Sequence, residues 1–256
     1  MSEEKLKIYI CCHKDYEDVG IKDSRYKIIT CKDIKNNSSL EMIKIDSELD
    51  DRMWSELASI YHIWKHPEMQ ADYIGLCHYR RYFDFMNDIP ETFEKPIVPK
   101  RIGSTFNNYI SYDIYHNSKD LFGIMRIIYN DYKDYFPAIR VMSDSYFYFP
   151  YNMFIFTKEL FNTYCEFLFG VLLQFDKKIK VNNDYSKMLE HIGDYRELYV
   201  ERGSYPNNTY EYQARLYGFL AERMSTAFIM KYIHDNGENS IAETAVKITE
   251  KTYNKI

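Results

Sequence analysis

The stretch from Asp72 to Asp84 constrains the fold more than any other part of this chain. It opens with an apolar run, Tyr73 to Cys77, and ends abruptly in the basic cluster His78-Tyr-Arg-Arg81. The apolar run predicts a buried strand, but a strand has no need of two adjacent arginines beside a histidine. Ligands of open α/β sheets bind at the carboxyl ends of the strands, and a guanidinium suits phosphate. These residues alone fit an anion site and a solvated strand end equally well.

The length and composition favour one globular domain. The chain has 256 residues, of which 46% are hydrophobic, enough for one large core or two small ones. No internal repeat, low-complexity tract or clear linker divides it. We therefore expect a single domain over residues 1–256, with 176–208 as an excursion and 234–256 as a C-terminal tail.

The charge and cysteine content narrow the partners and the compartment. A net charge of −5 gives no support for nucleic-acid binding. The five cysteines form an odd set without metal-type spacing, which predicts free thiols in a reducing compartment. No apolar signal core opens the chain, and no run reaches the roughly 18 apolar residues of a membrane span. We expect a cytoplasmic protein. Its 26 tyrosines and 16 phenylalanines leave peripheral contact with the inner face of the cytoplasmic membrane open, although most should fill the core.

Two further predicted strands also end in basic residues. The run Leu6 to Cys12 is followed by His13 and Lys14, and the short edge segment Pro96-Ile-Val-Pro99 is followed by Lys100 and Arg101. Taken alone, His13 and Lys14 fit an exposed turn better. Together with the central cluster, however, the three strand ends predict one positive pocket for a diphosphate.

Helical spacing of apolar residues alternates with these strands and predicts an α/β fold. A helix should begin after Asp50 and Asp51 and end near Pro67, with Glu56 beside its apolar stripe. Three more helices are expected over Asp120–Tyr135, Thr157–Phe175 and Tyr210–Ile233. Residues Ser111–Asn117 should form a mobile loop.

Several common catalytic motifs are absent. The chain has no Gly-x-x-x-x-Gly-Lys-Ser/Thr, no Gly-x-Gly-x-x-Gly and no Gly-x-Ser-x-Gly. His62 and His66 have the i, i+4 spacing of a zinc site, but the glutamate of that motif is missing. We interpret them as one helix face and predict no metal site.

Several blocks resemble the bacterial family of capsular and exopolysaccharide biosynthesis glycosyltransferases, long described as a domain of unknown function. The most specific block is Tyr73-Ile-Gly-Leu-Cys-His-Tyr-Arg-Arg-Tyr-Phe83. The others are Ile8–Lys14, Ser55–Lys65, Asn152–Phe169 and Gln213–Arg223. They follow the family's order and cover most of the domain. The Asp50-Asp-Arg-Met53 segment departs from the Gly-Asp-Asn-type loop that is frequent in the family.

The resemblance implies a GT-A-like nucleotide-diphospho-sugar transferase fold, a central, mostly parallel sheet flanked by helices. It also implies transfer of a sugar from a nucleotide-diphosphate donor, with a UDP-sugar of galactose form favoured. The implied acceptor is a lipid-linked or free oligosaccharide in capsule, exopolysaccharide or O-antigen synthesis. Where most enzymes of that fold carry a metal-binding Asp-x-Asp, this chain has His78-Tyr-Arg80. Cationic side chains are therefore expected to replace the metal, so no cofactor is predicted, although Mn²⁺ or Mg²⁺ stays compatible with the sequence.

The expected site follows from these strand ends and blocks. The predicted donor-binding residues are His13, Lys14, Glu56, His78, Tyr79, Arg80, Arg81, Lys100, Asn152 and Arg223. An inverting transfer needs a base near the acceptor hydroxyl, for which Asp144, Glu222 and Asp84 are the candidates. A retaining mechanism stays open, and the sequence does not specify an oligomeric state.

Two other function classes fit the same basic strand ends. A non-catalytic carbohydrate- or polyanion-binding module would bind without turnover. A nucleotidyl- or phosphotransferase would release pyrophosphate from a nucleoside triphosphate. Release of UDP from a UDP-sugar distinguishes a glycosyltransferase from both.

Overall fold

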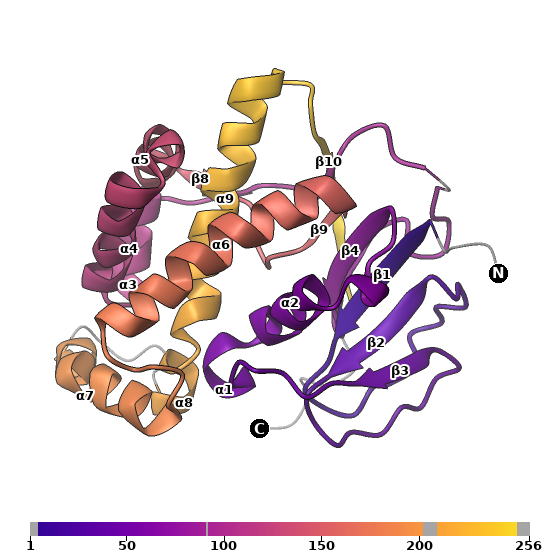
Figure 1. Cartoon of the computed structure of the whole chain (residues 1–256), viewed down its shortest axis with the longest axis horizontal. Helices are drawn as coiled ribbons and strands as arrows, with labels where there is room; N and C mark the ends of the chain where they lie inside the picture. The colour runs from indigo at the N-terminus through magenta and orange to yellow at the C-terminus, as the bar shows by residue number, and fades with distance from the viewer. Residues whose placement is uncertain (1–4, 91, 202–208, 250–256) are drawn as a thin grey trace.

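Apolar, β-rich runs from distant parts of the chain assemble into one mixed sheet, which confirms the predicted α/β class (Figure 1). The computed structural model describes residues 5–90, 92–201 and 209–249, without the side chains of 194–201. Within these residues nine strands form the main sheet, with the path β10-β6-β9-β4-β1-β2-β3 and with β5 and β11 beside it. Their bounds are β1 Leu6–Cys11, β2 Tyr26–Thr30, β3 Glu41–Lys44, β4 Tyr73–His78, β5 Arg81–Phe83, β6 Ile97–Pro99, β9 Phe154–Thr157, β10 Ala242–Thr244 and β11 Val246–Ile248. Two short strands, β7 (Ile102–Gly103) and β8 (Phe147–Tyr148), pair with each other.

The register of β4 decides where the basic cluster lies. β4 runs parallel to β1 from Leu6↔Tyr73 to Cys11↔His78, and antiparallel to β9 on its other side. β1 also runs parallel to β2. The carboxyl ends of β1, β2 and β4 therefore meet at one edge of the sheet, with His78 beside Cys11. β6 is separated from β4 by β9, so its basic end lies further along the same edge.

Helices cover one face of the sheet (Figure 1). Their bounds are α1 Asp51–Trp54, α2 Glu56–Lys65, α3 Asn108–Tyr115, α4 Ser118–Asp131, α5 Phe136–Asp144, α6 Lys158–Lys178, α7 Tyr185–Glu201, α8 Tyr210–Gln213 and α9 Leu216–Asn236, with 3₁₀ turns η1 Pro67–Met69 and η2 Lys133–Tyr135. α6 begins as its sequence predicts, because the Thr157 Oγ1 accepts a hydrogen bond from the Leu160 N–H at 3.3 Å. None of the described helices is long and apolar enough to cross a membrane.

The core divides into two clusters, one on each face of the sheet. Alternate β1 residues explain the division, since Tyr9 and Cys11 face α2, α6 and α9, whereas Ile8 and Ile10 face the other way. That second face is covered by loop residues such as Tyr16 and Met86. The helical face therefore carries the larger core, and it is the face on which cavity-lining helices can meet the strand ends.

One sequence expectation about a loop needs correction, and two further segments contain elements that the sequence did not reveal. Residues Ser111–Asn117 are mostly helical, because Asn107 caps α3 through a 2.9 Å bond from the Ile110 N–H to its Oδ1. The excursion 176–208 contains α7. The tail 234–256 continues α9 and then supplies β10 and β11, which pair with β6 and β5. Pairing between strands so distant in sequence leaves no local periodicity to detect. Residues 202–208 and 250–256 of these segments lie outside the described residues.

His116 at the end of α3 is a buried polar group that is held by one hydrogen bond and by ring stacking. Its Nδ1 lies 3.0 Å from the Gln213 Oε1, and its ring stacks on Phe219 with 4.1 Å between centroids. Burial lowers the pKa of His116 to about 3. The imidazole is therefore neutral in the folded protein at neutral pH and must stay neutral for the fold to persist.

We expect Gly75→Ala to destabilise the fold by about 1–3 kcal/mol, because an added methyl group overpacks the centre of the sheet. A Cβ at Gly75 would lie 2.8 Å from the Ile8 Cγ1 and 3.2 Å from the Ile155 Cγ1. The measurement is the free energy of unfolding in urea. Gly103→Ala is the matched control, since a Cβ at this β7 glycine meets nothing within 4 Å. Equal losses in the two variants would contradict the packing argument.

We also expect acid to unfold the protein partly through His116. Its pKa is depressed in the folded state, so below the ordinary value of about 6.5 the unfolded chain binds more protons, and stability falls as the pH drops from about 6.5 toward 3. One such group contributes a slope of at most about 1.4 kcal/mol per pH unit. His116→Gln, which stays neutral, should lose less stability between pH 7 and pH 4 than the wild type. The exposed His234→Gln should behave like the wild type; identical pH curves for all three proteins would refute this assignment.

Candidate active site at the carboxyl edge of the sheet

A cavity of about 340 Å³ opens where the carboxyl ends of β1, β2 and β4 meet the first turn of α2. Open α/β sheets bind ligands at this position. The residues that line the cavity are Cys11, Cys12, His13, Cys31, Lys32, Asp51, Arg52, Ser55, Glu56, Ser59, His78, Tyr185, Glu211 and Arg215.

Ser55 gives the cavity its shape by interrupting the helix that the sequence predicts to be continuous. Its φ of 52° and ψ of −132° end α1 at Trp54 and restart the chain as α2 at Glu56. A residue with a Cβ adopts such a conformation at a cost of about 1–3 kcal/mol, and strain of this kind concentrates at functional sites. The break turns the first turn of α2, with Glu56 and Ser59, toward the strand ends.

The amino-terminal end of α2 borders the cavity without a side-chain cap. The Ser55 side chain makes no capping hydrogen bond. Its Oγ instead accepts a bond from the Arg215 Nε at 2.9 Å. The first N–H groups of a helix and the positive end of its dipole attract anions. A guanidinium held beside this helix end strengthens that attraction.

Arg215 differs from the other cations of the cavity in having no acidic partner among the described residues. Lys32 pairs with Asp51 at 3.1 Å, and Arg52 pairs with Asp50 at 2.5 Å. The half-buried Arg215 lies between α8 and α9, where the Ser55 hydroxyl holds only its Nε. Its charge is therefore available to an anionic ligand.

The two histidines of the cavity do not carry the positive charge that the sequence suggested. Desolvation, followed by the nearby charges of Arg215 and Lys32, lowers the pKa of His13 to about 4. Burial also lowers the pKa of His78, although Glu56 opposes the shift. The His78 Nε2 lies 2.6 Å from the Tyr151 carbonyl oxygen, so it carries the proton and donates it. In the neutral ring the Nδ1 is then a hydrogen-bond acceptor.

Glu56 is held in place by a buried chain of polar groups. Its Oε1 accepts a bond from the Asn152 Nδ2 at 2.7 Å. The Asn152 Oδ1 in turn accepts from the Ser225 Oγ at 3.0 Å, and that hydroxyl lies 2.8 Å from the Tyr164 OH. Asn152 was predicted to bind the donor, but the structure places it behind Glu56 and not on the cavity wall. Its contacts suit a residue that orients the carboxylate.

The remaining members of the basic cluster flank the cavity and do not line it. Tyr79 meets His13 edge-on, with 4.9 Å between ring centroids. The Arg80 Cζ lies 4.8 Å from the centroid of Tyr79, and the Arg81 Cζ lies 4.3 Å from that of Tyr151. Of the four-residue cluster that motivated the site, only His78 contacts the cavity.

Glu222 and Arg223, on α9, do not line the cavity, because Tyr151 lies between Glu222 and His78 of the cavity wall. Tyr151 makes the connection, since its carbonyl accepts from His78 while its N–H donates to the Glu222 Oε1 at 3.0 Å. Burial raises the pKa of Glu222. The Arg223 Nη1 lies 3.8 Å from the Glu222 Oε2, and its guanidinium covers the Tyr148 ring. Glu222 thus keeps its place as a candidate base, next to the cavity.

Four other predicted residues lie away from the cavity. Lys14 and Lys100 are exposed, and Lys100 follows β6, beyond the intervening β9. Asp84 is exposed and accepts a bond from the Thr244 Oγ1 at 2.5 Å. Asp144 is exposed at the end of α5. The structure therefore brings neither Asp84 nor Asp144 to the cavity. Of the three basic strand ends that were expected to share one pocket, those of β1 and β4 contribute a residue to it, and that of β6 does not.

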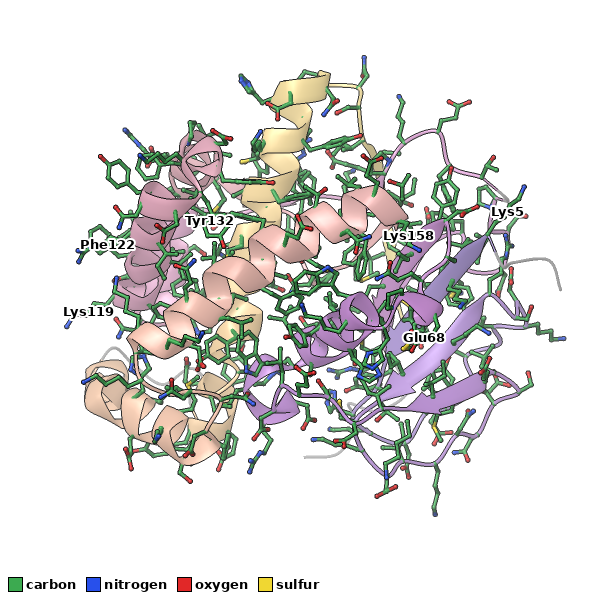
Figure 2. The ribbon with its side chains drawn as sticks, in the orientation of Figure 1. Lys5, Glu68, Lys119, Phe122, Tyr132 and Lys158 are labelled. Atoms are coloured by element: carbon green, nitrogen blue, oxygen red, sulfur yellow. The ribbon has the colours of Figure 1, made fainter. Side chains whose placement is uncertain are left out.

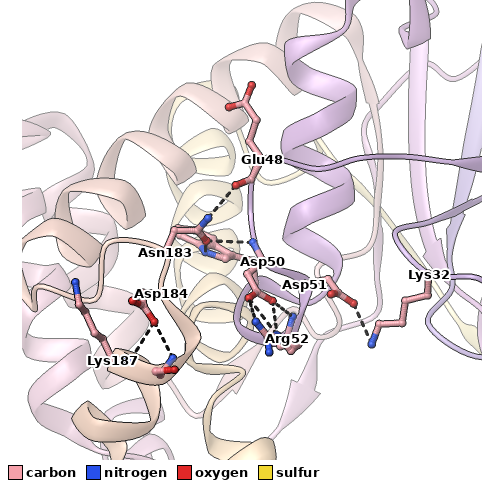
Figure 3. Close-up of polar contacts among 10 residues, drawn as sticks. Lys32, Glu48, Asp50, Asp51, Arg52, Asn183, Asp184 and Lys187 are labelled. Carbon is pink, nitrogen blue, oxygen red and sulfur yellow. Dashed lines mark hydrogen bonds and ion pairs between the residues drawn. The ribbon is translucent and has the colours of Figure 1, made fainter.

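The rim of the cavity is held by Asn183, just before α7 (Figure 3). Its Oδ1 accepts from the Asp50 N–H at 3.1 Å and from the Trp54 Nε1 at 2.9 Å, and its Nδ2 donates to the Glu48 carbonyl at 2.9 Å. The Arg52 guanidinium lies 4.1 Å from the centroid of Tyr185. These contacts bring the start of α7 against α1, where Tyr185 forms part of the cavity wall.

Sequence reasoning missed Lys32, Tyr185 and Arg215. Lys32 carries the same signal as His13, since it is a basic residue just after a β-rich run, the one that ends at Cys31. Arg215 lies inside the Gln213–Arg223 block, where nothing local distinguishes it from a surface arginine. Tyr185 reaches the cavity only through the contacts of Asn183, which no sequence pattern reveals.

The acidic residues around the cavity do not suit a divalent cation. Among residues 5–90, 92–201 and 209–249 no three His, Cys, Asp or Glu side chains gather as metal ligands would. Asp51 is paired with Lys32, and Glu56 is bonded to Asn152. We therefore assign no chemical step to a metal.

Comparison with known proteins supports the fold. Curated proteins give no match. Among solved structures, the apo structure of WbbM, a bifunctional glycosyltransferase, matches with a TM-score of 0.67 at 21% identity, over 96% of this chain and 46% of that one. The chain thus shares its fold with WbbM and spans about half of WbbM's length. A family model matches residues 7–198, most of the chain. The protein therefore belongs to the family described as a domain of unknown function, DUF4422.

Proposed function

We propose that this protein is a glycosyltransferase that moves a hexosyl group from a nucleotide-diphosphate donor to a saccharide acceptor. The observation that carries the proposal is the pairing of an uncapped helix end, at α2, with Arg215, which has no acidic partner among the described residues. Both lie at the edge of the sheet where α/β folds bind nucleotides. The fold shared with WbbM supports the same activity class.

We place the donor in the cavity in the orientation that matches its charges. A volume of about 340 Å³ lies in the range of small-molecule sites. The diphosphate would occupy the end of α2 beside Arg215. The nucleoside would lie toward Lys32 and Tyr185 at the rim, and the sugar toward Glu56 and His78. This order places the bond to be broken next to the carboxylate and the neutral imidazole.

The chain's own groups can supply the chemistry of transfer. The bond between the sugar C1 and the diphosphate oxygen breaks, and the electron pair leaves with the nucleoside diphosphate. Arg215 and the helix end stabilise the charge that develops on this leaving group. The acceptor oxygen bonds to C1 and loses its proton to a base. Glu222 suits that role, because its raised pKa brings it closer to neutral pH, and Glu56 would contact the donor sugar.

The favoured donor is a UDP-sugar, with galactose as the first candidate sugar. The acceptor would be an oligosaccharide, free or lipid-linked, in capsule, exopolysaccharide or O-antigen synthesis. We place the reaction in the cytoplasm, at the inner face of the membrane. These assignments rest on the sequence resemblance and go beyond what the fold supports.

We predict that the protein releases UDP from UDP-galactose and that a chelator does not reduce the rate. The measurement is nucleotide release and thermal stabilisation with UDP-galactose, UDP-glucose and GDP-mannose, each with and without EDTA. Loss of release in EDTA and its return with Mn²⁺ would contradict the metal-independent mechanism. Binding without turnover would indicate a carbohydrate-binding module, and pyrophosphate release from nucleoside triphosphates would indicate a nucleotidyltransferase.

We further predict that Arg215→Ala weakens UDP binding about 10- to 100-fold, the effect of losing a charge-assisted hydrogen bond. Arg215→Lys should recover part of the affinity, because it restores the charge but not the planar fork. Ser55→Ala should have a smaller effect, since it only releases the guanidinium. Calorimetric titration measures all three, with Arg126→Ala on the distant face of α4 as the control. Unchanged affinity in Arg215→Ala would refute the diphosphate assignment.

A further inference from the structure

Exposed apolar side chains concentrate in one segment of the chain. Among the residues whose side chains the structure describes, 11 large hydrophobic residues are exposed; nine of them lie between residues 102 and 146, and Met42 and Ile248 lie elsewhere. The segment contains α3, α4 and α5, which gather at the side of the molecule away from the strands β1, β2 and β3 (Figure 1). Scattered exposed hydrophobics need no explanation, but a concentration of this kind marks an interaction surface.

The outer face of α4 carries the most regular part of this surface. Lys119, Phe122, Arg126 and Tyr129 are spaced by three, four and three residues, so they form one stripe along the helix. Phe122 is 54% exposed and Tyr129 is 59% exposed. Lys119 and Phe122 point outward from α4 in Figure 2. We call these four residues the α4 stripe.

The opposite face of α4 packs inward, and within the described structure the stripe meets α5 through Tyr129, whose ring lies edge-on to Phe136 with 4.9 Å between centroids. Leu121, Ile124 and Ile128 on that face are fully buried in the helical core. The acid of the first turn, Asp120, also faces inward, where its Oδ1 lies 3.0 Å from the His191 Nε2. The stripe therefore alternates cations with aromatic rings and contains no acid.

The charges of the stripe are not neutralised by the protein. Within the residues the structure describes, neither Lys119 nor Arg126 forms an ion pair, whereas Lys27, Lys44 and Arg101 on other surfaces all do. Residues 102–146 as a whole contain four Lys or Arg and five Asp or Glu, a net charge of −1, so the positive charge belongs to the stripe itself and not to the segment. The exposed acids of the segment, such as Asp131 and Asp134, lie beyond the end of the stripe. The stripe is thus a local positive surface on an acidic protein.

We propose that the α4 stripe binds the surface of an anionic lipid bilayer. Aromatic rings alternating with cations suit the interface, where the rings enter the boundary of the acyl chains and the cations meet the headgroups. The neighbouring α5 adds the exposed Arg140 and Val141. This inference stands on the surface alone and does not depend on the proposed transferase activity.

Two other occupants fit the surface less well. A polysaccharide stacks on aromatic platforms, but the exposed aliphatic side chains Ile110 and Val141 offer no face for a sugar ring. A second copy that docks the same face about a two-fold axis would place Lys119 opposite Tyr129 and Arg126 opposite Phe122, which leaves both cations without a counter-charge. An anionic bilayer satisfies the rings and the cations together.

The test is flotation of the full-length protein with vesicles of phosphatidylcholine alone or with 30% phosphatidylglycerol (about one charged lipid in three). We expect binding only to the anionic vesicles, and a decrease with added salt. Phe122→Ser/Tyr129→Ser should lower the bound fraction about tenfold, and Lys119→Glu/Arg126→Glu should abolish binding. Met42→Ser/Ile248→Ser is the control, because it removes two exposed hydrophobic side chains from other surfaces and should bind as the wild type does.

Three outcomes would overturn the proposal. The first is no binding to anionic vesicles by the wild type. The second is equal binding by Phe122→Ser/Tyr129→Ser and by the control pair, with thermal unfolding confirming that both are folded. The third is absence of vesicle binding together with a stripe-dependent dimer in sedimentation, or with stripe-dependent binding of polygalacturonate. UDP release from UDP-galactose is measured in parallel, so a failure of membrane binding is distinct from a failure of the transferase assignment.

Discussion

The parallel pairing of β4 with β1 fixes the position of every other part of the site. The register places His78 beside Cys11, and β2 continues the same edge with Lys32 just past its end. A slip of one residue would turn His78 to the opposite face, away from α2. Gly75 supports this register, because the lack of a Cβ lets Ile8 and Ile155 close over the middle of the strand. The geometry of the cavity therefore depends on packing several residues away from it.

Ser55 converts that sheet edge into a binding site. In a continuous helix from Asp51, the N–H groups of the first turn of α2 would bond to carbonyl oxygens of the preceding turn. The break at Ser55 instead leaves this helix end without a side-chain cap, beside Arg215. The strained backbone is retained because α9, through Arg215, holds it from the other side of the cavity.

The sequence predicts the parts of this structure that depend on local patterns, and misses those that depend on distant contacts. The strand and helix spacing predicts the α/β class, and the apolar run before His78 correctly marks the central strand. It cannot reveal the break at Ser55, because the residues around it keep helical spacing. The local pattern also cannot reveal β10, because the three residues Ala242–Thr244 form a strand only by pairing with β6. Within the site, His78 and Glu56 follow from strand and helix ends, but Arg215 requires the three-dimensional fold.

The protonation of the two histidines decides which residues of the site can carry positive charge. The basic cluster suggests that histidine and arginine together neutralise a diphosphate, yet burial lowers the pKa of His78, and Arg80 and Arg81 stack on Tyr79 and Tyr151 outside the cavity. The charge that reaches the cavity comes from Arg215 and the α2 dipole. Arg81 acts on the site through its positive charge, which lowers the pKa of His78 and so helps to keep the imidazole neutral. A neutral imidazole beside an oriented carboxylate suits contacts with sugar hydroxyls, so under the proposed function the strand end would contact the sugar and the helix end would contact the diphosphate.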